Sequence, residues 1–142
     1  MSRINWSRVI LAGLVAGIVV NVSEYVLNIV VMKPQWQAAM HTLARPYPES
    51  AAALAGWALW GLLIGFALAW LYAAVRPRFG AGLRSAAAAA MAGWCLDCLV
   101  PAIAFSILGL LPLSMVVILS AWAVPEHLLA ATAAGWIYRE SS

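Results

Sequence analysis

Four long runs of apolar residues, separated by short polar stretches, account for most of the chain. They extend over residues 9–32, 51–75, 85–110 and 113–138, and each is long enough for the about 20 residues that an α-helix needs to cross a bilayer. Alanine, leucine and glycine dominate these runs, without the alternation of apolar and polar residues typical of a membrane β-strand. The pattern therefore predicts one all-α domain over residues 1–142, an integral membrane bundle of four transmembrane helices.

The polar connections between these runs differ in length and character. The connection at residues 33–50 is long, and its Trp36, Met40 and Leu43 recur at helical spacing. This spacing predicts a short amphipathic helix in the membrane interface, with an ordinary loop anchored by Trp36 as the alternative. The last connection is a tight, uncharged turn around Pro112, which predicts that the third and fourth runs pack as an antiparallel hairpin.

The composition agrees with a chain that lies almost wholly in a lipid bilayer. Hydrophobic residues make up 65% of the sequence and charged residues 9%, whereas a soluble domain carries about 25% charged residues. These values exclude a water-soluble enzyme and a disordered segment. The formal net charge of +3 comes from basic residues spread over the connections, so the sequence predicts no nucleic-acid partner.

The basic residues instead indicate how the chain is oriented. With four crossings, six of the eight lysine and arginine residues fall on one side of the membrane. Basic residues accumulate on the cytoplasmic side, so we expect both termini in the cytoplasm and a multi-pass protein of the bacterial inner membrane. The six are Arg3, Arg8, Arg76, Arg78, Arg84 and Arg139, and the two on the other side are Lys33 and Arg45.

Three of the five acidic residues lie inside the apolar runs, where ionised groups are costly. Glu24, Asp97 and Glu126 belong to the first, third and fourth runs, and His127 is the only candidate base at that depth. An ionised, unpaired carboxylate in the centre of a transmembrane helix costs about 2.5–3.5 kcal/mol or more. These acids must therefore be protonated, hydrogen-bonded to one another, or paired with a bound cation.

Helical geometry predicts that two of these acids meet at one depth. Asp97 and Glu126 lie about equally far along the chain from the turn at Pro112, so an antiparallel hairpin brings them level. Two carboxyls held together in a low dielectric cannot both ionise cheaply, so we expect them to share a proton that an arriving cation displaces. A permanent structural hydrogen bond between the same two carboxyls is the alternative.

The function that this pattern favours is the binding or transport of a cation or proton through the carboxylate cluster. The residues assigned to the site lie near mid-membrane or share the helix face of Glu24. Three tryptophans near that depth would add an aromatic lining that attracts an organic cation. The cation- or proton-binding residues are Glu24, Asp97, Glu126, His127, Asn21 and Asn28, and the aromatic lining is Trp60, Trp94 and Trp122. No cofactor is expected, and the pattern favours a protein without enzymatic activity, with a redox or metal enzyme as a third option.

A different class of function is a non-catalytic membrane subunit or scaffold that packs against a partner protein or a second copy of the chain. Small residues let transmembrane helices approach closely. In this alternative, Gly13 and Gly17 of the first run and Gly61 and Gly65 of the second form the interface.

Two cysteines and a possible metal site complete the chemistry of the apolar runs. Cys95 and Cys98 form a Cys-x-x-Cys pattern, but on an α-helix they lie about 160° and about 100° around the axis from Asp97. We therefore predict that both are small packing residues. A metal site formed by the three acids and His127 stays open, because carboxylates with one imidazole suit manganese, iron or zinc. Against it, the adjacent Glu126 and His127 do not share a helix face as a Glu-x-x-His pair does.

Three short motifs give the chain a resemblance to known proteins. They are Ile4-Asn5-Trp6, the Asn-x-x-Glu-x-x-x-Asn pattern at residues 21–28, and Trp136-Ile137-Tyr138-Arg139-Glu140. In these, and over nearly its full length, the chain resembles small uncharacterised bacterial four-helix integral membrane proteins, a grouping that implies no established activity. By size alone it also looks like small multidrug transporters, whose first helix carries a glutamate that binds lipophilic cations. Those proteins lack the acids of the third and fourth helices, so no residue role follows from that similarity.

Overall fold

The computed structural model describes residues 4–138, and every regular element in that range is helical. Two short segments, η1 and η2, are π-helical and continue the α-helices on either side of them. This confirms the all-α fold for the described residues. The elements are α1 (Trp6–Tyr25), η1 (Val26–Val31), α2 (Lys33–Thr42), α3 (Ala51–Phe79), α4 (Leu83–Trp94), η2 (Cys95–Leu99), α5 (Val100–Ile107) and α6 (Leu113–Ile137).

Four continuous helical stretches are long and apolar enough to cross a membrane, in agreement with the predicted number of candidate spans. They cover Trp6–Val31, Ala51–Phe79, Leu83–Ile107 and Leu113–Ile137. The second stretch continues beyond the expected end of its apolar run, because charged residues end a hydrophobic pattern without ending a helix. It stops only at Gly80, whose backbone φ is +80°.

Polar side chains cap the first turns of two of these helices. The side chain of Asn5 accepts a hydrogen bond from the backbone N–H of Arg8 at the start of α1. Ser50 accepts one from the N–H of Ala53 in the same way at the start of α3. Each cap satisfies a backbone donor that has no partner within its helix, so helix boundaries follow these residues and not the hydropathy pattern alone.

The long connection forms a short helix, α2, and so agrees with the first of the two predicted alternatives. Pro34 lies in its first turn, where the missing N–H costs nothing. Trp36 packs on a small core cluster, and Ala39 belongs to that cluster, whereas Leu43 is exposed. At its start, Lys33 forms an ion pair of 2.8 Å with Glu49, and this partner raises the pKa of the lysine.

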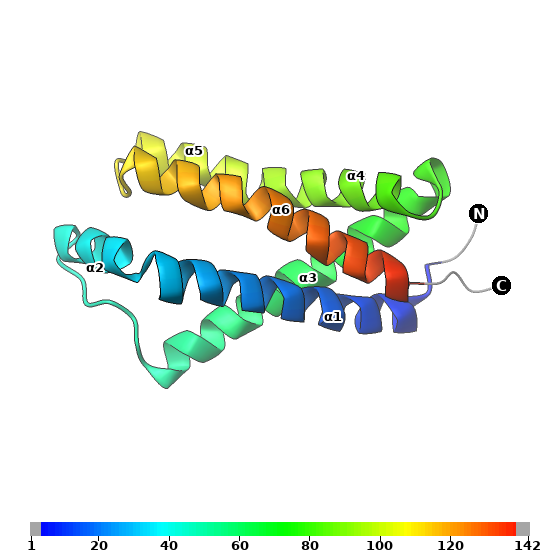
Figure 1. The fold of residues 1–142 in the computed structure, drawn as a ribbon, viewed down its shortest axis with the longest axis horizontal. Helices are drawn as coiled ribbons and strands as arrows, with labels where there is room; N and C mark the ends of the chain where they lie inside the picture. Colours follow the sequence, from blue (N-terminus) through cyan, green and yellow to red (C-terminus); the bar gives the residue numbers. More distant parts are fainter. Residues whose placement is uncertain (1–3, 139–142) are drawn as a thin grey trace.

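The bundle is tightly packed at one end and open at the other. Figure 1 shows α3 crossing behind α1, with its N-terminal half projecting away from the other helices, and α6 crossing in front of the α4–η2–α5 stretch. The main core is built largely from alanine and lies toward the end where Tyr138 of α6's C-terminal cap meets Asn5. At the other end, no residue of α5 is buried by the described part of the chain, and nearly all of residues 51–60 of α3 are exposed.

Glycines bring α1 and α3 into close contact where these two helices cross. A Cβ on Gly65 would fall against the backbone of Gly17, and one on Gly61 would lie 2.7 Å from the amide of Asn21. A Cβ on Gly13 would meet the ring and backbone of Phe66. The four glycines assigned to a partner interface are therefore used within the chain, which corrects that assignment: the stripe of small residues packs α1 on α3.

Candidate functional site

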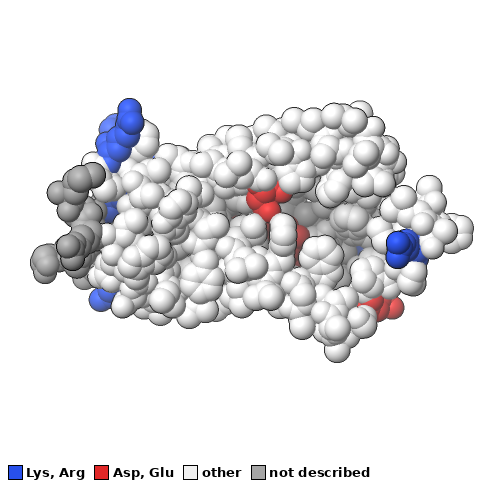
Figure 2. Space-filling model, turned by 180° about the vertical axis from the view of Figure 1, so that it is seen from behind, with Lys and Arg blue, Asp and Glu red and all other residues white. Residues whose placement is uncertain are grey.

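The acidic residues of the apolar helices gather in the middle of the molecule. Glu126 and His127 are neighbours on α6 and are only 3% and 1% exposed, and Asp97 of η2 lies opposite His127. Glu24, near the end of α1, interacts electrostatically with all three of these residues. Figure 2 shows acidic side chains at the surface midway along the molecule, whereas lysines and arginines lie toward its two ends. We call these four residues the carboxylate–histidine cluster.

The imidazole of His127 has one satisfied nitrogen and one unsatisfied nitrogen. Its Nδ1 lies 2.9 Å from the carbonyl oxygen of Ala123, one turn earlier on α6. A carbonyl only accepts hydrogen bonds, so Nδ1 must carry the hydrogen and Nε2 of the neutral ring presents a lone pair. That Nε2 is 3.5 Å from Oδ2 of Asp97 and makes no hydrogen bond within the described residues. A buried acceptor that faces a partly exposed carboxylate oxygen calls for a proton or a cation between them.

The carboxyl of Glu126 lies on the other side of the same ring. Its Oε1 is 3.8 Å from Nδ1 of His127, and its Oε2 is buried without a hydrogen-bond partner in the described structure. No direct hydrogen bond joins Asp97 to Glu126 among residues 4–138, so the ring of His127 stands where the sequence predicted a contact between carboxyls. The orientation of α6 explains this difference, because His127, one residue after Glu126, is the residue that contacts Asp97 of η2.

Glu24 connects the cluster to α2 through two hydrogen bonds. The amide of Asn28 donates to Oε2 of Glu24 at 2.5 Å, and the indole N–H of Trp36 donates to Oδ1 of Asn28 at 2.7 Å. Trp36 thus fixes the orientation of the amide that holds Glu24. Sequence reasoning assigned Trp36 to the membrane interface and missed this contact, because no periodicity relates residues on two helices that meet at the bend near Met32.

Two residues assigned to the site lie elsewhere. The amide of Asn21 donates to the backbone carbonyls of Gly17, at 2.9 Å, and of Ala58, at 3.1 Å, so it connects α1 to α3. Trp60 is 51% exposed on α3. The structure therefore does not bring either residue into the carboxylate–histidine cluster.

The other two tryptophans form hydrogen bonds between the helices around the cluster. The indole of Trp94 donates to the carbonyl of Ser120 at 2.9 Å, which joins α4 to α6. The indole of Trp122 donates to the hydroxyl of Ser23 at 2.9 Å, which joins α6 to α1. Both therefore position the elements that carry the cluster, and their role as an aromatic lining stays a prediction.

Cys98 lies at the cluster, contrary to the prediction from the helical wheel. Its Sγ donates a hydrogen bond to Oδ2 of Asp97 at 3.7 Å. The prediction assumed α-helical spacing, but Cys95–Leu99 is the π-helical segment η2, in which the N–H of Val100 donates to the carbonyl of Cys95. The following Pro101 has no N–H with which to continue the α-helical pattern. One ligand atom each of Asp97, Cys98 and His127 lies within 4.8 Å of the others.

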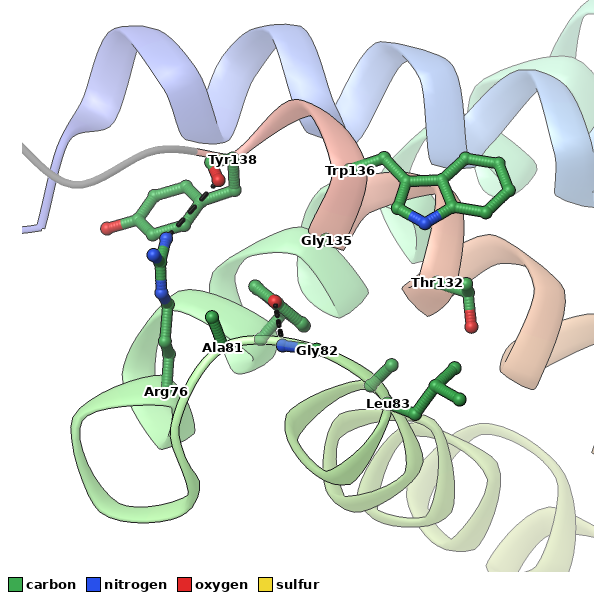
Figure 3. Close-up of a pocket in the computed structure, with 10 residues that line it drawn as sticks. Arg76, Ala81, Gly82, Leu83, Thr132, Gly135, Trp136 and Tyr138 are labelled. Carbon is green, nitrogen blue, oxygen red and sulfur yellow. Dashed lines mark hydrogen bonds between the residues drawn. The ribbon is translucent and has the colours of Figure 1, made fainter.

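Away from the cluster, a hollow of about 140 Å³ lies where the ends of α3 and α6 meet the start of α4 (Figure 3). Arg76 donates to the backbone carbonyl of Tyr138 at 3.3 Å. The guanidinium of Arg76 also lies 5.5 Å from the centre of the Tyr138 aromatic ring. The N–H of Gly82 donates to the hydroxyl of Tyr72 at 3.0 Å. These contacts fasten the α3–α4 turn and the end of α6 to one another, so we assign this hollow to the packing of the bundle end.

The carboxylate–histidine cluster is thus the part of the described structure that offers binding chemistry. It combines buried, unsatisfied polar atoms with groups from α1, η2 and α6. No protein-family model matches the chain, and the searches of curated proteins and of solved structures give no match either, so no family is assigned.

Proposed function

We propose that the chain is a multi-pass membrane protein that binds a cation or proton at the carboxylate–histidine cluster and passes it across the bilayer. The observation that carries this proposal is the pair of unsatisfied buried atoms, Nε2 of His127 and Oε2 of Glu126. Leaving a buried polar atom without a partner costs about 1–3 kcal/mol. A helix bundle that needed only a core would place apolar side chains there, so a bound cation or proton gives these atoms their role.

The charges around the cluster favour a cation over an anion. Glu24, Asp97 and Glu126 converge there, and the only basic side chain among the described cluster residues is the imidazole of His127. Lysine and arginine side chains lie toward the two ends of the molecule (Figure 2). An anion would meet three carboxyls in a low dielectric, whereas a cation would be attracted by them.

The uneven packing of the bundle supports access from one side at a time. The hydrogen-bonded series Trp36, Asn28 and Glu24 forms a polar route from α2 to the cluster. The opposite half is filled by the alanine core. A bound ion in this conformation would therefore exchange with the α2 side, and release to the other side would require the core helices to separate.

Ion flux into vesicles containing the purified protein tests the function. We expect flux of a proton or of a metal cation down its gradient, and Asp97→Asn or His127→Gln should slow it about 10–100-fold, because a hydrogen bond to a charged group contributes about 1.5–3 kcal/mol. Glu49→Gln, which changes an acid paired with Lys33 outside the cluster, should leave the rate unchanged. No flux of any cation, together with a co-purifying membrane protein, would instead support the non-catalytic subunit.

We further propose that both termini lie in the cytoplasm and that the membrane is the bacterial inner membrane. Four spans return the chain to the side on which it began, and the N–H of Asn5 donates to the hydroxyl of Tyr138 at 3.4 Å. Six of the eight basic residues then lie inside. A reporter fused after Ser142 should be active in the cytoplasm, and activity only in the periplasm would reverse the assigned topology.

A further inference from the structure

Three side chains of the cluster are spaced like the ligands of one metal ion. Oδ2 of Asp97 lies 3.5 Å from Nε2 of His127 and 3.7 Å from Sγ of Cys98. In a tetrahedral zinc site the ligand atoms are about 2.0–2.3 Å from the metal, so neighbouring ligand atoms are about 3.3–3.7 Å apart. All three ligand atoms lie within 4.8 Å of one another, so small rotations of the side chains bring them around a common centre.

The hydrogen bonding of His127 is that of a metal ligand. Histidines that bind a metal through one ring nitrogen almost always donate the other N–H to a carboxylate, carbonyl or water, which fixes the tautomer and the ring orientation. Here Nδ1 donates to the carbonyl of Ala123 at 2.9 Å. Nε2 is buried, has no hydrogen-bond partner in the described residues, and faces Asp97. The Nε2 lone pair is thus free to bind a metal ion and faces the carboxylate of Asp97 and the sulfur of Cys98.

Two consecutive residues of the π-helical segment η2 supply ligand atoms at the same point. Asp97 and Cys98 are neighbours in η2, and on an α-helix their side chains would point about 100° apart. In η2, Sγ and Oδ2 come within 3.7 Å of each other. π-Helical turns occur frequently at functional sites, and this one gives η2 two ligands toward one metal.

The charge and the chemical softness of the three ligand groups together select the class of metal ion. A carboxylate and a thiolate carry two negative charges, which a divalent ion neutralises, and neutrality matters most where the dielectric is low. Imidazole and thiolate favour zinc and related transition metals, whereas magnesium and calcium prefer oxygen ligands alone. Three protein ligands leave a fourth position of a tetrahedral ion for water, as in sites whose metal remains accessible.

We infer that the cluster binds a divalent transition metal ion, with zinc as its reference, through Asp97, Cys98 and His127. This inference rests on the proposed function, in which the cluster takes a cation, and it names the class of that cation. On binding, the thiol of Cys98 loses its proton to solvent and the sulfur takes the metal in its place. Cys98 then becomes a ligand, and Glu24 and Glu126 remain as acids beside the site.

Cobalt(II), a spectroscopic substitute for zinc, tests the inference on the full-length protein in detergent under reducing conditions. We expect a thiolate-to-cobalt charge-transfer band that zinc abolishes and that magnesium and calcium leave unchanged. Cys98→Ser should remove the band, and His127→Gln should weaken cobalt binding at least about 100-fold, because even a hydrogen-bond partner of a metal ligand contributes about 10–100-fold in affinity. Helical circular dichroism of each variant shows whether it is folded.

Two matched variants provide the controls. Cys95→Ser changes the other thiol of the same π-helical segment, and His41→Gln changes a histidine on α2; neither should alter the band or the affinity. A band that survives Cys98→Ser, or cobalt binding that folded His127→Gln retains in full, would overturn the metal site. Vesicle flux that depends on Asp97 but carries only protons or monovalent ions would also overturn it while leaving the proposed function intact, and absence of both flux and cobalt binding would overturn both.

Discussion

Gly65→Ala should be among the most destabilising single substitutions in this protein, lowering the free energy of unfolding by about 1–3 kcal/mol or more. Gly65 lies where α3 crosses α1, and a Cβ there would fall against the backbone of Gly17. A backbone neighbour cannot rotate away as the end of a flexible side chain can, so the two helices must separate. Unfolding of the purified protein by a denaturing detergent, followed by circular dichroism, measures the change.

Gly56→Ala is the matched control on the same helix. A Cβ at Gly56 would meet nothing within 4 Å among the described residues. Alanine is favoured over glycine in a helix by about 0.5–1 kcal/mol, so this variant should be unchanged or slightly stabilised. If Gly65→Ala were as stable as Gly56→Ala, the close crossing of α1 and α3 would be wrong.

Replacing Glu126 with methionine should have the opposite effect on stability and raise the free energy of unfolding by about 1–3 kcal/mol. The carboxyl of Glu126 is buried, and its Oε2 has no hydrogen-bond partner within the described chain. Removing an unsatisfied buried polar group recovers its desolvation cost, and apolar side chains of similar volume are often neutral or stabilising in such places. Ion flux should be lost in the same variant, since a functional carboxyl is kept at the expense of stability.

The control for this prediction is the same change at an acid outside the cluster. Glu49 is exposed and paired with Lys33, and exposed ion pairs contribute about 0–1 kcal/mol, so Glu49→Met should lower stability slightly and leave flux unchanged. Loss of stability in Glu126→Met together with unaltered flux would identify Glu126 as a structural hydrogen-bonding residue, contrary to its proposed role.

The spans of this protein follow from hydropathy, because a bilayer requires about 20 apolar residues in a helix whatever their neighbours are. The start of α3 at Ala51 and of α6 at Leu113 agree with the sequence prediction. Other boundaries are harder to predict, since a cap such as Asn5 decides where a helix begins and a glycine such as Gly80 decides where one stops. These residues act locally and leave no trace in an averaged hydrophobic pattern.

The contents of the cluster follow from the sequence only in part. An acid inside an apolar run is visible as such, and Glu24, Asp97 and Glu126 are near one another in the structure. Cys98 and Asn21 were misplaced for separate reasons. The helical wheel fails at η2, where the turn is wider than an α-helix. Asn21 shares the face of Glu24, but the crossing angle of α1 and α3 brings a backbone carbonyl within its reach first.

In a bilayer, the sparse packing along α5 and the first turns of α3 would make the surrounding lipid a structural component of the protein. In a bilayer, acyl chains would fill the spaces that side chains fill at the alanine-rich end. Helix spacing there would then follow bilayer thickness and chain composition, because helices adapt their tilt to the hydrocarbon around them. The cluster lies between the two parts of the bundle, with Glu126 and His127 buried on α6 and Asp97 in η2, next to the sparsely packed α5. Membrane composition would thus act directly on the distances between the side chains of the carboxylate–histidine cluster.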